Sequence, residues 1–485
     1  ALFAAFAATA APAGEPPAPA ASEMVPDPLG GYPREVARAL NHGEALTALD
    51  LSGAPIRDLR PLAKLPLKKL SLRDCREIDD FTPLAAMKSL ETLYLGGTAI
   101  KNLAPLRGLA LKKLDLSACG QIAAFAPLAT LPSLEELDLG ETAIADLAPL
   151  AKLPLKKLSL KDCRGLAAFA PLTTLRALEE LDLSGAAIPD LAPLQGLPLQ
   201  VLDLSGCAKI ADFAPLAAMK SLEELRLGGA PLPDLTPLQG LSLQALDLTG
   251  WSQSADFAPL AGMKTLKALY LGRTAIADLK PLTGLPLKRL SLYGCGKVAD
   301  FAPLAEMKSL EELLLGETAI ADLAPLRGLP LRKLHLGGCG QVADLAPLAA
   351  ATALAELYLD RTAVADLTPL AQLPLRELGL EGCGKIADFA PLAGLGSLKW
   401  LSLQETAIAD LSPLAGLKSL KALLLAHTPI ADLTPLKGLR LEVLVLAGCD
   451  KLADLAPLKG MKTLKALVLT DTRFAKSSLR DVVGE

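Results

Sequence analysis

One motif, L-x-x-L-x-L, dominates the sequence and returns twenty times between Leu46 and Leu469. Successive motifs begin 21 or 23 residues apart in alternation, except for one step of 22 residues after Leu398. Two sister units therefore alternate: a shorter one, as at 310–330 (LEELLLGETAIADLAPLRGLP), and a longer one, as at 287–309 (LKRLSLYGCGKVADFAPLAEMKS). Such a regular period indicates a stack of similar units, and not the separate domains of roughly 150 residues that chain length alone would suggest.

Each unit predicts a half-buried strand followed by a short turn. In L-x-L the two leucines point to the same side of an extended strand, and the residue between them points to the other side. The downstream A-D-L-x-P-L or A-D-F-x-P-L carries an Asp that can cap a helical turn and a Pro that presets its backbone. A lone unit cannot bury its leucines, so its stability must come from stacking on its neighbours. We therefore expect a curved parallel sheet with short turns outside it.

This pattern resembles the leucine-rich repeat, and the T-x-I-x-D-L-x-P-L-x-x-L form of the shorter units is similar to the internalin-type repeats of bacterial surface proteins. The resemblance covers about residues 46–470, although Thr or Cys stands where Asn is usual in that family. It implies an α/β repeat solenoid, a leucine-rich repeat horseshoe with about twenty parallel strands on its concave face and short helical turns on its convex face. It also implies that the concave sheet binds other macromolecules.

Four segments are expected along the chain. They are a signal-like, Pro/Ala-rich flexible segment, an N-terminal cap, the leucine-rich repeat domain and a C-terminal cap, at residues 1–28, 29–45, 46–470 and 471–485. Apolar residues at positions 36, 37 and 40 have helical spacing between Pro33 and Gly43, which predicts a capping helix. After Leu469 the D-L-x-P-L turn is lost, which predicts a short closing segment.

The first segment determines the expected location of the protein. Its apolar run and the small residues after it resemble the h-region and the A-x-A cleavage site of a secretory signal, which predicts an exported protein of the periplasm, the medium or the cell surface. The alternative is a low-complexity tail, which leaves a cytoplasmic location open. Elsewhere no run of ~18 apolar residues occurs, so no membrane span is expected.

The eight cysteines share one position, three residues after the L-x-L of a long unit, and Trp251 occupies that position in the remaining long unit. Successive cysteines should lie two strand spacings apart, roughly 9.6 Å. A disulfide needs Cα atoms within about 7 Å, and zinc ligands must converge on one ion. We therefore expect a row of buried, inert thiols, with a reactive thiol such as Cys295 as the alternative. The row comprises Cys75, Cys119, Cys163, Cys207, Cys295, Cys339, Cys383 and Cys449.

The sequence offers no catalytic constellation. His42, His335 and His427 stand in the cap and in two distant repeats, and His335 and Cys339 should face opposite sides of their strand. Glycines occur singly, without the strand-loop-helix setting that cradles phosphates. We expect no enzyme activity, no cofactor and no metal. The net charge of −4 also gives no electrostatic footprint for nucleic acid.

Charged residues form two columns on the expected concave face. The residues before the first strand leucine alternate in sign on adjacent strands, which predicts a self-neutralising ladder. They are Lys113, Glu136, Lys157, Glu180, and later Arg289, Glu312, Lys333, Glu356. The middle column, between the two leucines, instead carries Asp115, Asp138, Asp182 and Asp203. Either Lys113, Lys157 and Lys161 offset these carboxylates, or they form a face for a basic partner.

Aromatic residues gather in the second half of the middle column and beside it. Aromatics make up only 4% of the chain, so a cluster on one face indicates a binding surface. Beyond Trp400 the same face becomes apolar. The predicted partner-binding residues are Tyr270, Tyr293, His335, Tyr358, Trp400, Leu424 and Val445.

The sequence thus predicts a non-enzymatic module that recognises a protein partner through its concave sheet. One alternative is structural self-association, as a homodimer, through the apolar C-terminal part of that sheet. Another is glycan binding by stacking on the aromatic side chains. The identity of a partner does not follow from the repeat pattern.

Overall fold

The computed structural model describes residues 46–475 and, outside that range, Tyr32, Val36, Arg38, Leu40 and Val482. The predicted signal-like segment, residues 1–28, lies outside the described residues, and so do most positions of the two predicted caps. Within the predicted N-terminal cap, Val36, Arg38 and Leu40 have helical backbone and Val36 is buried. None of the helices among the described residues has the length and apolar character needed to cross a bilayer.

The chain forms two compact units, residues 1–187 and 188–485, and each is a series of strands and short 3₁₀ turns. The strands of the first unit are β1 (Ala48–Asp50), β2 (Lys69–Ser71), β3 (Thr92–Tyr94), β4 (Lys113–Asp115), β5 (Glu136–Asp138), β6 (Lys157–Ser159) and β7 (Glu180–Asp182). Its turns are η2 (Leu62–Lys64), η3 (Thr82–Ala86), η4 (Ala104–Leu106), η5 (Ala126–Thr130), η6 (Ala148–Leu150) and η7 (Ala170–Thr174). Each strand pairs in parallel with the next one along the chain.

The second unit repeats the same arrangement. Its strands are β8 (Val201–Asp203), β9 (Glu224–Arg226), β10 (Ala245–Asp247), β11 (Ala268–Tyr270), β12 (Arg289–Ser291), β13 (Glu312–Leu314), β14 (Lys333–His335), β15 (Glu356–Tyr358), β16 (Glu377–Gly379), β17 (Trp400–Ser402), β18 (Ala422–Leu424), β19 (Val443–Val445) and β20 (Ala466–Val468). Its turns are η8 (Ala192–Leu194), η9 (Ala214–Ala218), η10 (Thr236–Leu238), η11 (Ala258–Gly262), η12 (Lys280–Leu282), η13 (Ala302–Glu306), η14 (Ala324–Leu326), η15 (Ala346–Leu348), η16 (Thr368–Leu370), η17 (Ala390–Gly394), η18 (Ser412–Leu414), η19 (Thr434–Leu436) and η20 (Ala456–Leu458). These strands also pair in parallel and in chain order.

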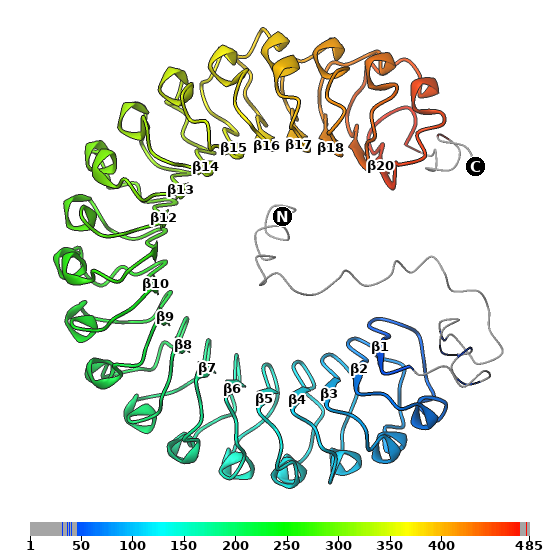
Figure 1. Ribbon diagram of the computed structural model, residues 1–485, viewed down its shortest axis with the longest axis vertical. Helices are drawn as coiled ribbons and strands as arrows, with labels where there is room; N and C mark the ends of the chain where they lie inside the picture. The colour runs from blue at the N-terminus through cyan, green and yellow to red at the C-terminus, as the bar shows by residue number, and fades with distance from the viewer. Residues whose placement is uncertain are drawn as a thin grey trace. The chain divides into compact units, whose positions relative to one another are not determined.

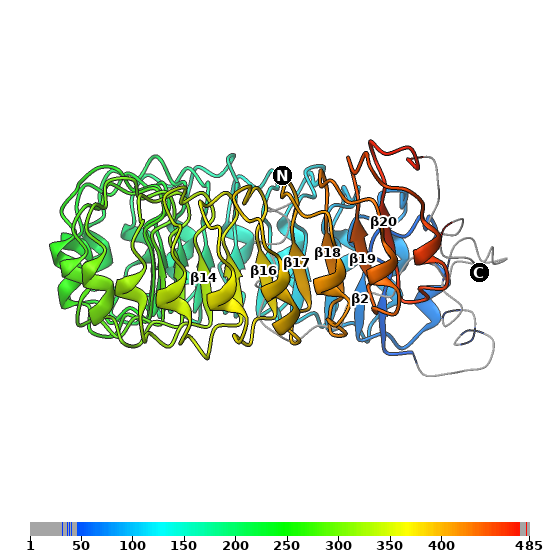
Figure 2. The same ribbon diagram turned by 90° about the horizontal axis from the view of Figure 1, so that it is seen from above.

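Within each unit the strands line the inner, concave side and the turns line the outer side (Figure 1). The view from above shows β16 to β20 standing side by side (Figure 2). The predicted fold class, a repeat solenoid of twenty parallel strands with short helical turns behind them, is confirmed for the described residues. The side chains that alternate with the buried leucines form the concave surface of each unit, here called the strand face.

The core of one repeat illustrates why the pattern folds this way. In the unit at 287–309 the buried side chains come from the strand, the Cys position and the turn, and they all point between the two layers. They are Leu287, Leu290, Leu292, Cys295, Val298, Phe301, Leu304 and Met307. The turn of the next unit is closed by Asp322, whose Oδ1 accepts a hydrogen bond from the N–H of Ala324, the first residue of η14, at 2.8 Å. The Asp of A-D-L therefore bonds the start of the turn as predicted, but from the position before the N-cap residue Leu323.

The cysteines form the predicted buried row. The Sγ of Cys295 donates to the carbonyl oxygen of Leu271 in the preceding unit at 3.0 Å, and Thr274 Oγ1 donates to the same oxygen at 2.8 Å. The thiols of Cys75, Cys119, Cys163, Cys339, Cys383 and Cys449 make the equivalent contact. Burial raises the pKa of five of them, at Cys75, Cys119, Cys163, Cys339 and Cys383, which disfavours the reactive thiolate.

Trp251 fills the same place with a far larger side chain. It is 1% exposed, its Nε1–H donates to the carbonyl oxygen of Leu232 at 2.6 Å, and its ring meets Phe257 edge-on at 5.1 Å. The indole thus also donates to a backbone carbonyl of the preceding unit, although to that of Leu232 and not to that of the second strand leucine, and it fills more of the core.

We predict that Trp251→Ala lowers the stability of the second unit by about 3–5 kcal/mol, because it leaves a cavity and an unbonded carbonyl. Urea unfolding followed by circular dichroism measures the change. Trp251→Phe, which retains a ring and loses only the hydrogen bond, should cost less. Equal losses for the two variants would contradict the packing argument.

Candidate functional site

The predicted charge ladder forms ion pairs at three of its four predicted places on the strand face, while Arg289 and Glu312 stand in register without an ion pair. Lys113 pairs with Glu136 at 3.0 Å, Lys157 with Glu180 at 2.7 Å, and Lys333 with Glu356 at 2.7 Å. Such exposed pairs contribute little to stability, and their main effect here is to cancel charge across neighbouring strands.

A second ladder, which the sequence did not predict, runs one residue earlier, at the position just before each strand. We call this series the edge row. In the first unit it alternates strictly in sign, as Lys68, Glu91, Lys112, Glu135, Lys156 and Glu179, with ion pairs of 2.8 Å at Lys112–Glu91 and Lys156–Glu135. The doublets K-K and E-E before the strand leucine are the sequence signal for these two parallel ladders.

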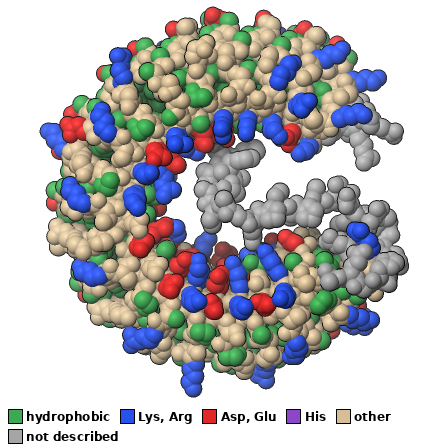
Figure 3. Space-filling model, viewed as in Figure 1, with side chains coloured by type: hydrophobic (Ala, Val, Ile, Leu, Met, Phe, Trp, Pro, Cys, Tyr) green, Lys and Arg blue, Asp and Glu red, His purple; other side chains and the backbone are tan. Residues whose placement is uncertain are grey.

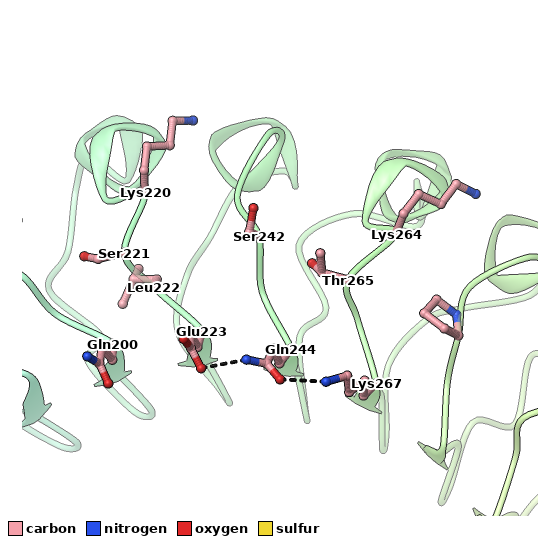
Figure 4. Close-up of a pocket in the computed structure, with 11 residues that line it drawn as sticks. Gln200, Lys220, Ser221, Leu222, Glu223, Ser242, Gln244, Lys264, Thr265 and Lys267 are labelled. Atoms are coloured by element: carbon pink, nitrogen blue, oxygen red, sulfur yellow. Dashed lines mark hydrogen bonds between the residues drawn. The ribbon is translucent and has the colours of Figure 1, made fainter.

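The edge row also borders an open hollow beside β9 to β11 (Figure 4). Its base is a hydrogen-bonded chain in which Gln244 Nε2 donates to Glu223 Oε2 at 2.6 Å and Lys267 Nζ donates to Gln244 Oε1 at 2.9 Å. Lys220 and Lys264 point away from this chain in the close-up view. These polar groups bond to one another and do not converge on a common point.

One carboxylate in the acidic column of the first unit, that of Asp115, is compensated by a cation within the protein. Asp115 is 3% exposed, and its carboxylate accepts from Arg73 Nε at 2.7 Å, while Arg73 also stacks on the ring of Tyr94 at 4.3 Å. Burial, with a further contribution from the Asp115 carboxylate, raises the pKa of the neighbouring Asp138. The compensating cation is thus Arg73, whereas the closest acidic partners of Lys113 and Lys157 are glutamates.

The remaining two aspartates fall on different units. Asp182 lies on β7, and its carboxylate accepts a hydrogen bond from Ser159 Oγ at 3.3 Å. Asp203 lies on β8 and pairs with Arg226 at 3.3 Å. A basic partner for Asp115, Asp138, Asp182 and Asp203 stays a prediction.

Four of the predicted binding residues meet on the strand face of the second unit and form what we call the aromatic row. The ring centroids of Tyr293 and His335 lie 6.2 Å apart, those of His335 and Tyr358 5.5 Å apart, and those of Tyr358 and Trp400 6.0 Å apart. Tyr270, on β11, takes no part in these ring contacts. The row is half-buried, so each ring keeps an accessible edge.

Glycines make the close approach of these rings possible. A Cβ atom on Gly316 would lie 2.8 Å from His335 Nδ1 and 2.9 Å from the Tyr293 ring, and one on Gly337 would lie 2.9 Å from His335 Cε1. The rings therefore lie flat against backbone where any other residue would displace them. The sequence contains this signal, because Gly follows the second strand leucine in these two units, but only the structure shows which rings use the space.

Hydrogen bonds and cations hold the aromatic row in place. Tyr293 Oη donates to Glu317 Oε1 at 2.6 Å, and Tyr358 Oη donates to Glu377 Oε2. The ammonium group of Lys333 lies 5.7 Å from the centre of the Tyr358 ring. A ring fixed by such contacts loses little side-chain entropy when a partner docks on it.

His335 and Asp360 are the titrating groups within this surface. Burial, assisted by the positive charge of Lys333, lowers the pKa of His335, so its imidazole is neutral at pH 7. This agrees with the hydrogen bond that its Nδ1 accepts from the N–H of Gly337 at 3.3 Å. Burial raises the pKa of Asp360 to about 6, and the nearby Glu381 carboxylate adds to the effect.

The apolar strip continues the aromatic row toward the C-terminal end of the unit. Leu424, Val445 and Val468 stand in register on β18, β19 and β20, and Val468 is 37% exposed. A second apolar column runs beside them, with Trp400, Ala422, Val443 and Ala466 in register. We call the residues on β18 to β20 in these two columns the apolar strip. The structure thus brings Leu424 and Val445 together and places them next to Trp400.

The described residues offer no catalytic or metal-binding constellation. His335 lies on the strand face, whereas Cys339 is buried and its Sγ donates to the carbonyl oxygen of Leu315 at 3.1 Å. Within the described part of the chain, no three His, Cys, Asp or Glu side chains converge to hold a metal ion.

The parallel register, the leucine core and the 3₁₀ turns together decide the fold. The chain folds as a leucine-rich repeat protein. Among solved structures it is similar to an internalin of Listeria monocytogenes (19% identity, 87% of each chain, TM-score 0.27) and to a leucine-rich repeat protein of Leptospira interrogans (20% identity, 81% of this chain and 93% of that one, TM-score 0.44). It is also similar to TLR13, solved in complex with ssRNA13 (19% identity, 91% of this chain and 85% of that one, TM-score 0.46). No family model and no curated protein matches it.

The pKa of Asp360 leads to a prediction about this leucine-rich repeat surface. Because the folded-state pKa of about 6 exceeds the ordinary value of 3.8, the folded protein binds this proton more tightly than the unfolded chain does. The stability contributed by the protonated form is therefore fully present only below the ordinary pKa of 3.8 and is lost as the pH rises through 6. Asp360→Asn should raise the urea midpoint at pH 7.5 and leave it nearly unchanged at about pH 3. An equal gain at both pH values would show that the ionised carboxylate is not the cause.

Proposed function

We propose that the protein is a non-enzymatic recognition module that binds a protein partner through the strand face of its second unit. The observation that carries this proposal is the continuity of the aromatic row with the apolar strip. Aromatic side chains held by neighbours, next to accessible aliphatic ones, have the composition of interface hot spots.

The charges around the aromatic row support a specific interface. Lys333 and Glu356 neutralise each other beside Tyr358, and Arg361 pairs with Glu381 at 2.9 Å. A partner that covers these rings therefore need not strip solvent from an unpaired charge at those two places. The flanking ion pairs also restrict which polar groups a partner can present there, which favours selectivity.

A triple variant, Tyr293→Ala/Tyr358→Ala/Trp400→Ala, tests the proposal. Truncation of hot-spot aromatics costs about 2 kcal/mol or more at each position, so capture of the partner from extracts of the source cells should fall by at least about tenfold. Quantitative mass spectrometry of the captured proteins measures the change. Tyr270→Ala should have little effect, because Tyr270 stands outside the aromatic row.

The matched control removes three exposed side chains at or next to the turns of the same unit, in the variant Glu306→Ala/Lys308→Ala/Gln372→Ala. It should capture the partner as the unaltered protein does. If the turn-side variant loses the partner and the aromatic variant keeps it, the partner binds the outer side and the proposal is wrong.

Self-association is the second candidate, and the exposed Val468 in the apolar strip favours it. In that case light scattering during size exclusion finds a dimer, and Leu424→Asp/Val445→Asp converts it to a monomer. Glycan binding by stacking on Tyr358 or Trp400 is a third candidate, which a glycan array tests.

We also propose that the protein acts outside the cytoplasm of a bacterium, as the signal-like composition of residues 1–28 and the internalin-type repeats suggest. Fractionation of the source cells, with N-terminal sequencing of the mature chain, tests this location.

A further inference from the structure

The order of charges in the edge row changes beside the apolar strip. At β12 to β14 it still alternates, with Lys288 paired to Glu311 at 2.9 Å and Arg332 to the same carboxylate at 3.6 Å. At β16, β17 and β18 it carries three cations in succession, Arg376, Lys399 and Lys421. Like charges side by side on neighbouring strands cost stability. Elsewhere in the row at most two cations are adjacent, Lys267 and Lys288 before β11 and β12, so this run of three is the longest among the described residues.

The backbone shows that these cations are direct neighbours. The N–H of Lys399 donates to the carbonyl of Arg376 and the N–H of Lys421 donates to the carbonyl of Lys399, both at 2.8 Å. Lys421 pairs with Glu442, which also pairs with Lys465 at 2.7 Å. Among the described residues, no carboxylate lies within ion-pair distance of the exposed Arg376 and Lys399. In the upper part of Figure 3, Lys and Arg side chains line the inner margin of the unit.

The opposite margin of the same surface carries carboxylates. Glu381, which pairs with Arg361 at 2.9 Å, and Glu405 follow β16 and β17, and Asp471 follows β20. Between the margins, β17 to β20 present Trp400 and the apolar strip, while β16 presents Glu377, whose carboxylate accepts from Tyr358 Oη. An occupant with carboxylates along one side is therefore attracted in one orientation and repelled in the other.

We infer that the face over β16 to β20 binds a protein segment that is mainly apolar and carries carboxylates along one of its edges. These carboxylates lie against Arg376, Lys399 and Lys421. This inference names the kind of partner and rests on the proposed function. β16 to β20 span four strand spacings of ~4.8 Å, roughly 19 Å, which a helix of about 13 residues covers at ~1.5 Å per residue. An amphipathic acidic helix, or an extended segment of the same chemistry, has the required shape.

A phage-displayed library of random peptides about 15 residues long tests the inference on the full chain, that length being slightly more than such a helix needs. We expect the selected peptides to be enriched in large apolar residues together with Asp and Glu. Synthetic copies are then titrated by fluorescence, for which Trp400 is the responsive tryptophan because Trp251 is 1% exposed. Added salt should weaken the binding, since the charges at the margin are exposed.

The charge-reversal variant Arg376→Glu/Lys399→Glu should weaken binding of these peptides by about tenfold or more, the order expected when two interfacial charge pairs become repulsive. The matched control is Lys264→Glu/Lys267→Glu, which changes the net charge equally at exposed positions beside β11. It should change the affinity by less than about twofold, as for surface charges far from the interface.

Several outcomes would overturn the inference. Peptides without acidic enrichment, equal loss in the two charge variants, or no peptide above background would each exclude an acidic segment as the occupant. A dimer of the unaltered protein that Leu424→Asp disrupts would show that a second copy occupies the face.

The proposed function fails separately from the inference. Some peptides could bind without changing Trp400 fluorescence and keep their affinity for the variant Tyr358→Ala/Trp400→Ala. Such peptides bind away from the aromatic row, and they contradict both the proposed function and the acidic partner. Peptides that lose affinity in that aromatic variant, but not in Arg376→Glu/Lys399→Glu, contradict only the acidic partner.

Discussion

Burial of strand and turn leucines against the next repeat is the interaction on which the rest of the structure depends. In the unit at 287–309, Leu290 from the strand, Leu292 just after it and Leu304 from the turn are all buried. One repeat is too thin to cover these side chains by itself, so the neighbouring repeats must bury them. Backbone hydrogen bonds of the parallel sheet also join each repeat to the next. In the cysteine row, each thiol donates a further hydrogen bond to a carbonyl of the preceding unit, as Cys295 does. Each repeat is therefore stabilised by its neighbours, and the strands must stay in register for the leucines to meet.

Register has a consequence for every other position. Equivalent residues of successive repeats lie one strand spacing apart. A residue type that recurs at one position of the repeat therefore forms a row along the surface. Alternating Lys and Glu give neutral rows, as at Lys113 and Glu136, and these make the surface uniform. We propose that recognition of a partner depends on the places where a row departs from its rule. The rings of the aromatic row, the aliphatic side chains after Trp400 and the cations at Arg376 and Lys399 are three such departures within one region.

Much of this could be predicted from the sequence because the period fixes the direction of each side chain. The strand phase, the buried cysteine row, the aspartates before the turns and the ladder at Lys333 and Glu356 all follow from position within the repeat. Contacts that depend on the length of a side chain, or on the space that a glycine leaves, could not be predicted from position within the repeat. Arg73 reaches Asp115 across two strands, at a sequence separation of 42 residues, and no rule of position predicts that reach. Likewise, Tyr293 meets His335 across the intervening repeat because Gly316 leaves room between them.

The departures from the neutral pattern also show how stability and recognition compete in such a chain. Asp360 is held half-buried with a raised pKa, and Arg376 and Lys399 stand beside each other without a carboxylate at ion-pair distance among the described residues, so the folded protein bears an electrostatic cost at both places. Replacement by the alternating pattern of the first unit would remove the cost at the edge row with no change to the core. A repeat solenoid can tolerate such a local cost because each repeat interacts only with its neighbours, and the leucine core beneath β16 to β18 is as complete as elsewhere. Binding of the inferred acidic segment would recover that cost, so we interpret the run of cations as a feature of binding and not of folding.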